Sequence, residues 1–182
     1  MDRMSLIRQP RGLSLIALLV ATSLPLLGQR KIAEVHVRGS RRFSAHDVIA
    51  ASGLRAGAPY SAAAVERAAR RLADTGAFSE VSPMVVPAYS SVILDWYLTD
   101  APRFVPARFA GFTGLSQAQL EDAAHQVPLF HGELPLLKPG LADQVAAALQ
   151  SLLEAHHLSG RVEHRFAGHG GDIESVVFRV VK

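Results

Sequence analysis

Histidines form the most concentrated group of chemically versatile side chains in this sequence, because imidazole binds metal ions and exchanges protons near neutral pH. Six of the eight histidines lie between His125 and His169, and His156 and His157 are adjacent. Adjacent side chains on a helix point about 100° apart. The chain also contains no H-E-x-x-H motif or comparable spacing. The pattern therefore favours surface and helix-end histidines over a zinc site, and no metal or other cofactor is expected.

The residue types of hydrolase chemistry are present without the spacing that hydrolases use. Serine, histidine and aspartate occur throughout, but the chain has no G-x-S-x-G motif and no glycine-rich phosphate loop. The run G-H-G-G-D at residues 168–172 is typical of a hairpin turn. The chain has no cysteine, which excludes disulfides, thiolate metal sites, iron–sulfur clusters and a thiol nucleophile. We therefore expect a protein that is not an enzyme.

Arginines form two groups that could contact lipid head groups or an acidic partner. They are Arg38, Arg41 and Arg42 near a predicted strand-to-helix turn, and Arg67, Arg70 and Arg71 on a predicted helix. Glu66 and Asp74 are interspersed with the second group, so a solvated helix face is the alternative interpretation.

The N-terminus has the pattern of an export signal. Arg3, Arg8 and Arg11 precede an uncharged run from Gly12 to Gly28. A basic segment followed by an apolar one predicts a signal peptide over residues 1–28. The uncharged run of 17 residues is also at the lower limit of about 17–25 for a membrane-spanning helix, so a retained anchor remains the alternative. Either interpretation places the rest of the chain outside the cytoplasm.

The charge of the chain is concentrated in this segment. The 182 residues carry a net charge of +3, of which residues 1–28 hold +2, residues 29–100 hold +2 and residues 101–182 hold −1. Removal of the signal leaves a net charge of +1. Nucleic-acid binding depends on neutralising phosphate charge, so a nucleic-acid partner is not expected.

Residues 29–100 predict one small α+β domain. The predicted order is a strand over 31–38, helices beginning after Ser44 and Ser61, and strands over 78–86 and 91–99. Alternation along the first strand gives it one buried face, formed by Ala33, Val35 and Val37. Gly53 and Gly76 lie just past the predicted helix ends, where left-handed residues terminate helices.

Residues 101–182 repeat this order as a second domain. Gly111 and Ser116 each lie 72 residues after their counterparts in the first half, Gly39 and Ser44. The loop through Pro135 and Pro139 is longer than its counterpart. The predicted fold is therefore α+β, with two tandem β-α-α-β-β units. Each unit is expected to have a three-stranded mixed sheet covered by two helices. A unit of about 75 residues buries only about 60% of its unfolded surface, so we expect the two units to contact each other.

The first unit resembles a POTRA domain, the periplasmic polypeptide-transport-associated module of outer-membrane assembly and two-partner secretion proteins. The matching positions are Val35, Val37 and Gly39, Phe43-Ser44, Leu54 and Gly57, Tyr60-Ser61, and Leu72 with Thr75-Gly76 and Phe78. The second unit resembles a more divergent repeat at Phe109, Gly111, Leu115-Ser116, Gly132 and Gly160. It lacks the T-G-x-F ending of the first unit.

The resemblance implies a binding function in the periplasm, associated with the outer membrane. The implied partners are outer-membrane barrel or assembly proteins and unfolded client polypeptides, with possible peripheral membrane contact. A POTRA chain without the barrel is expected, because eight or more membrane strands of about 9–11 residues do not fit after Lys182. The alternative is an inner-membrane-anchored structural protein similar to the division-type POTRA proteins, which carry a single POTRA unit.

The family resemblance also points to the strand after the second helix as the place where a client strand adds. In the first unit this strand contains Pro83 and Pro87, which remove hydrogen-bond donors and discourage pairing. The corresponding strand of the second unit, 161–166, has no proline. The predicted partner-binding residues are therefore Val162, Glu163, His164 and Arg165. The alternative interpretation is a short edge strand protected by its charges.

Overall fold

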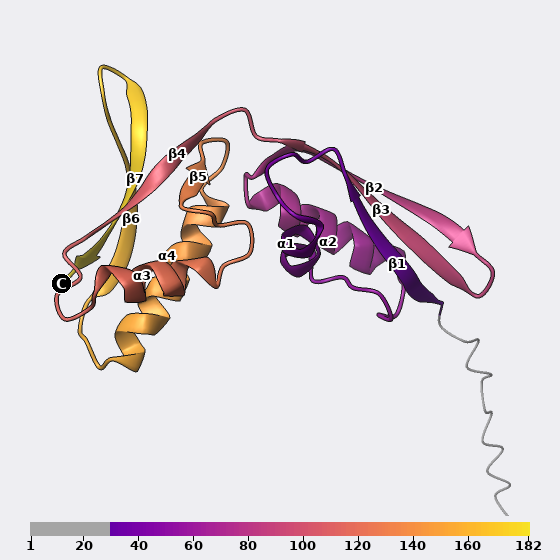
Figure 1. Cartoon of the computed structure of the whole chain (residues 1–182), viewed down its shortest axis with the longest axis horizontal. Coiled ribbons are helices and arrows are strands. Elements are labelled where there is room, and N and C mark those ends of the chain that lie inside the picture. The colour runs from indigo at the N-terminus through magenta and orange to yellow at the C-terminus, as the bar shows by residue number, and fades with distance from the viewer. Residues whose placement is uncertain (1–29) are drawn as a thin grey trace, which may run out of the picture.

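The computed structural model describes residues 30–182, so the predicted signal over 1–28 lies outside the described residues. The described chain forms two units that lie one after the other along the long axis of the molecule (Figure 1). Each unit has one sheet with two helices packed on one face. This is the α+β tandem that the sequence predicts.

The first unit has the predicted element order and sheet. Its elements are β1 (Lys31–Arg38), α1 (Ala45–Ser52), α2 (Ala62–Asp74), β2 (Phe78–Ala88) and β3 (Ser91–Asp100). The strand order is β1-β3-β2, with β1 parallel and β2 antiparallel to β3. Ser44 and Asp47 form a reciprocal capping box that starts α1, and Gly53 ends it at a φ of 69°.

The second unit has one strand more than the sequence predicts. Its elements are β4 (Phe104–Ala110), α3 (Gln117–His125), β5 (Glu133–Pro135), α4 (Gly140–Ala155), β6 (Arg161–His169) and β7 (Asp172–Val181). The strand order is β5-β4-β7-β6. The expectation of three strands is wrong here because the longer loop before α4 runs antiparallel to β4 and pairs with it as β5. In the first unit, residues 57–60 run beside β1 in the same way but form only an isolated bridge.

A β-bulge changes which residues of β1 are buried. The pairing of β1 with β3 shifts between Ile32 and Glu34, so Ala33 is an extra residue in the ladder. A bulge reverses the alternation of faces along a strand. Ile32 is consequently 1% exposed and Ala33 is exposed, while Val35 and Val37 pack against the core. The prediction that Ala33 shares the buried face is therefore wrong.

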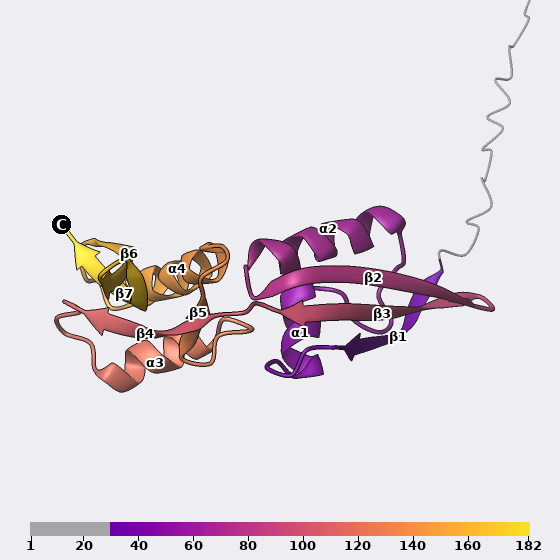
Figure 2. The same cartoon turned by 90° about the horizontal axis from the view of Figure 1, so that it is seen from above.

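The N-terminus of α4 is docked on the C-terminus of α2. Helix α4 begins after Pro139 without a side-chain cap, so its first N–H groups need other acceptors. The N–H of Leu141 donates to the carbonyl oxygen of Thr75, just past the end of α2, at 3.0 Å. The two helices lie one after the other (Figure 2). The negative end of one helix dipole therefore meets the positive end of the next.

This contact between the units requires glycine. A Cβ atom added to Gly140 would lie 2.0 Å from the carbonyl oxygen of Asp74. A Cβ atom added to Gly76 would lie 2.6 Å from the carbonyl oxygen of Lys138, and Gly76 also has a left-handed φ of 73°. Nζ of Lys138 lies 3.3 Å from Oδ1 of Asp74 across the same contact. The two units thus meet through closely fitted backbone.

We predict that Gly140→Ala lowers the free energy of unfolding. Alanine in place of glycine normally stabilises a helix by about 0.5–1 kcal/mol. At this position the added methyl group collides with the backbone of α2, so the sign should reverse. Chemical denaturation measures the effect, with Gln144→Ala on the exposed side of α4 as the control. An unfolding free energy at or above that of the wild type would contradict the docked contact.

Candidate functional site

Strand β6 lies at the edge of the second sheet and pairs only with β7. The N–H of Val162 donates to Oε1 of Gln150 on α4 at 2.9 Å, so this group points away from β7. Backbone groups alternate sides along an antiparallel strand. Those of His164 and Phe166 therefore also point outward, which gives β6 an edge that can pair with another strand.

A groove of about 390 Å³ lies beside this edge, between β6 and α4. Asp143 and Ala146 line it from α4, and residues 161–164 line it from β6. One wall thus carries strand backbone and the other carries helix side chains. An extended peptide needs both features, because main-chain hydrogen bonds supply affinity and side-chain pockets supply specificity.

Val162 and His164 face the helix side of the sheet. Val162 is 8% exposed. The His164 side chain is 16% exposed, with its ring centroid 6.2 Å from that of Phe166 and 5.9 Å from that of Phe178. Its Nε2 lies 3.8 Å from Oδ1 of Asp143. His164 therefore forms part of the groove wall rather than projecting into solvent.

Glu163 and Arg165 lie on the opposite face of β6. Both are exposed, and a Glu163 carboxylate oxygen lies 3.9 Å from the Arg179 guanidinium on β7. The four predicted residues are therefore contiguous on the edge strand, two on each face. Phe166, two positions after His164, is 40% exposed and extends the apolar part of the edge.

The far end of β6 extends beyond the rest of the sheet. Strand β4 pairs with β7 only over residues 107–110 and 176–179. The β6–β7 hairpin continues past this pairing and projects away from the second unit (Figure 1). Residues near the turn at Gly170 are thus open on several sides, which gives an incoming strand room to align.

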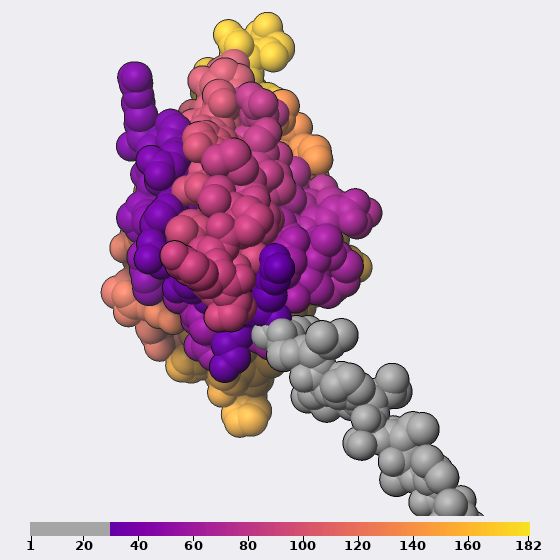
Figure 3. All heavy atoms as spheres, turned by 90° about the vertical axis from the view of Figure 1, so that its right-hand side faces the viewer, coloured from indigo at the N-terminus to yellow at the C-terminus, as the bar shows by residue number. Residues whose placement is uncertain are grey.

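The corresponding edge in the first unit is β2, which forms part of the end face of the molecule together with β3 (Figure 3). Pro83 and Pro87 pair opposite Trp96 and Val92 without any break in the ladder. Proline has no N–H. Because the two prolines are four residues apart, their backbone groups point to the same side of the strand. Both missing donors therefore belong to the outer edge of β2, where an added strand would need them.

Arg38 lies on the outer face of the first sheet, in a polar network. Its Nε is 3.3 Å from Oδ1 of Asp95, a residue that is only 5% exposed. Nδ1 of His36 lies 3.0 Å from the same oxygen, and its Nε2 lies 2.9 Å from Glu34. This arginine neutralises a buried carboxylate within the unit.

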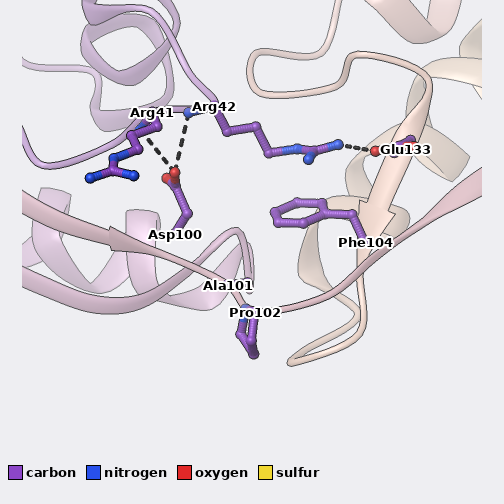
Figure 4. A pocket seen from close by; sticks show the side chains of 7 residues that line it. All are labelled: Arg41, Arg42, Asp100, Ala101, Pro102, Phe104 and Glu133. Atoms are coloured by element: carbon purple, nitrogen blue, oxygen red, sulfur yellow. Dashed lines mark hydrogen bonds and ion pairs between the residues drawn. The ribbon is translucent and has the colours of Figure 1, made fainter.

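Arg41 and Arg42 line a cavity of about 440 Å³ between the two units (Figure 4). The Arg42 guanidinium lies 3.9 Å from the ring centroid of Phe104 and bonds to Glu133, both in the second unit. The backbone N–H groups of Arg41 and Arg42 donate to Asp100. The Arg41 guanidinium points away from Arg42. Arg42 therefore holds the two units together, and contact of Arg41 with lipid or an acidic partner stays a prediction.

The family of the first unit follows from a comparison with protein-family models. Residues 30–99 match the POTRA family, described as surface antigen variable number repeat. Residues 30–99 are a POTRA domain. The match spans β1 to β3, and the second unit has the same core order of strands and helices with β5 added.

Solved structures of POTRA domains are similar to the tandem. POTRA1-2 of Omp85 from Anabaena is 13% identical, with 85% of this chain and 98% of that chain covered, at a TM-score of 0.40. POTRA1-3 of the same protein is 17% identical, with 83% and 61% covered, at 0.38. Haemophilus influenzae BamA POTRA3-5 is 15% identical, with 85% and 62% covered, at 0.35. The chain thus spans less than two thirds of the two longer fragments. No curated protein matches it.

Sequence reasoning missed the side chains that complete the edge and the contact between the units. Gln150 and Asp143 lie on α4, and nothing in their helical spacing indicates which strand they face. Phe104 and Glu133 both contact Arg42, which is far from each of them in the sequence. In residues 30–182 no cluster of three potential metal ligands occurs. Within that same range no helix is long and apolar enough to cross a membrane.

We predict that acid removes stability that Asp47 contributes to the start of α1 and, through His131, to the contact with the second unit. Burial raises the pKa of this carboxyl, but hydrogen bonds from Ser44 and the nearby His131 outweigh burial and hold it below its ordinary value. Oδ2 of Asp47 lies 3.4 Å from Nε2 of His131 in the second unit. A lowered carboxyl pKa adds stability above the unfolded-state pKa, and that stability is lost as the pH falls through the lowered value.

Asp47→Asn should therefore have a lower Tm than the wild type at pH 7, and the difference should shrink below about pH 4. Thermal unfolding followed across this pH range tests it, with Asp122→Asn on the exposed side of α3 as the control. A difference in Tm that stays constant from neutral to acid pH would count against this role of Asp47.

Proposed function

We propose that this protein is a periplasmic protein-interaction module that acts in outer-membrane protein assembly or transport. It binds an extended client strand, or a strand of an assembly partner, along the outer edge of β6. The proposed partners are outer-membrane barrel or assembly proteins and unfolded client polypeptides. The protein supplies a binding surface and no catalytic group.

The open edge of β6 beside the α4 groove is the observation that carries this proposal. The outward backbone groups of His164 and Phe166 follow one another along the strand, and the groove accepts the side chains of an added chain. Prolines remove two donors from the equivalent edge of the POTRA domain. Of the two other edges, the start of β1 is paired with residues 57–60, and the second sheet ends in β5, a strand of only 3 residues that includes Pro135.

The side chains around β6 support a client of alternating polarity. Phe166 and Ala146 offer apolar contact on the helix side. Glu163 and Arg165 offer charges of both signs on the other face. A strand with apolar residues on one face and polar residues on the other matches this arrangement, and membrane-barrel strands alternate in this way. This is the chemical class of client that we propose.

Phe166→Pro should weaken client binding about tenfold. Proline at this outward-facing position removes one donor from the edge and obstructs pairing beyond it. A tenfold loss corresponds to about 1.4 kcal/mol, the upper range for one hydrogen bond. Phe166→Thr keeps the N–H and loses the ring, so it separates the ladder from the apolar contact. Titration with a synthetic peptide that copies one strand of an unfolded outer-membrane protein, followed by NMR, measures both variants.

The matched control is Val85→Pro on β2, which also lies on the outward-facing side of its strand. It should leave the affinity for the peptide unchanged. Chemical-shift changes confined to residues 30–99 would overturn the proposed site, as would equal affinities of Phe166→Pro and the wild type.

The export proposal is tested at the N-terminus of the protein purified from cells. Signal cleavage should leave a mature chain that starts near Leu24 or Gln29. Intact-mass spectrometry distinguishes this product from a chain that retains Met1. A retained Met1 would support the anchored alternative and contradict a freely periplasmic protein.

A further inference from the structure

The side chain of Gln150 occupies the first outward position of β6. Its Oε1 accepts from the N–H of Val162 at 2.9 Å, and its Nε2 donates to the carbonyl oxygen of Gly160 at 3.4 Å. Nε2 also lies 3.1 Å from Oε1 of Glu154. A carboxamide has the same donor and acceptor groups as a peptide bond. Gln150 therefore makes the contacts that a neighbouring strand would make at this point.

The contact is needed when no other strand is present. Val162 is 8% exposed, and a buried N–H without an acceptor costs about 1–3 kcal/mol. Residues 57–60 cover the start of β1 with backbone, and β5 covers residues 104–106 of β4 in the same way. At Val162 a single side chain with rotatable bonds does the same, so it can move away without unfolding any element.

We propose that Gln150 is a removable cap on the β6 edge that determines where an added strand begins to pair. Pairing starts at His164 and Phe166, and it extends to Val162 only when the Gln150 amide is displaced. An extension to Val162 gains little affinity, because one hydrogen bond replaces another. The part of this inference that concerns binding rests on the proposed function, whereas the cap itself is a property of the free protein.

Amide hydrogen exchange in the free protein tests the cap directly. Gln150→Ala should speed exchange at the Val162 amide at least tenfold and leave Phe178 on β7 unchanged. Gln150→Glu keeps an oxygen acceptor for Val162 and should retain most of its protection. Gln144→Ala, on the exposed side of the same helix, should change neither amide. Unchanged exchange at Val162 in Gln150→Ala would overturn the cap.

Peptide length tests the role of the cap in binding. The probe is the synthetic outer-membrane strand peptide, compared with versions lengthened by two residues at either end. In the wild type, the version that reaches Val162 should bind within about twofold of the short one. In Gln150→Ala it should bind several-fold more tightly than the short one.

The two proposals fail in different ways. Equal gains from lengthening in the wild type and in Gln150→Ala would overturn the role of Gln150 in setting where pairing begins. Absence of peptide binding to both proteins would overturn the proposed function, and with it the binding part of this inference. Hydrogen exchange at Val162 would still decide whether Gln150 caps the edge.

Discussion

The edges of the two sheets impose the constraint that organises this molecule. An edge strand presents N–H and C=O groups that must be paired, bonded to water or protected from other chains. The chain meets this requirement in three ways. Backbone segments cover the start of β1 and residues 104–106 of β4, prolines remove donors from β2, and a side chain caps only the start of β6. The proposed binding site is the part of β6 that this cap leaves open.

The same requirement for hydrogen-bond partners connects the two units. Helix α4 has no side-chain cap, and the carbonyl oxygen of Thr75 serves its first turn instead. A helix end thus becomes part of the contact between units, and the tight approach at Gly140 and the Arg42 contacts with Phe104 and Glu133 add to it. Helix α4 also forms one wall of the groove. The contact therefore sets where the proposed site lies relative to the POTRA domain.

Local signals made most of the fold predictable from sequence. The serine caps, the glycine terminators and the alternation of strands each depend on a few neighbouring residues, and the repeat of these signals gave the tandem. The errors have non-local causes. The bulge at Ala33 depends on the pairing of β1 with β3, and β5 depends on the path of a loop against β4. The strand that carries the candidate site was predictable, whereas Gln150 was not, because its partner Val162 lies across a turn and on another element.

The two units differ in how permanently their equivalent edges are closed. Pro83 and Pro87 lack donors covalently, so no movement of β2 can restore them. Gln150 makes one hydrogen bond with Val162 and one with Gly160, each worth about 0.5–1.5 kcal/mol net, and an added strand could replace them with its own. The equivalent edges of the two units thus differ in whether an added strand could replace what occupies them. The two units share a fold. They differ in the few residues at the strand edge that decide whether an added strand could pair there.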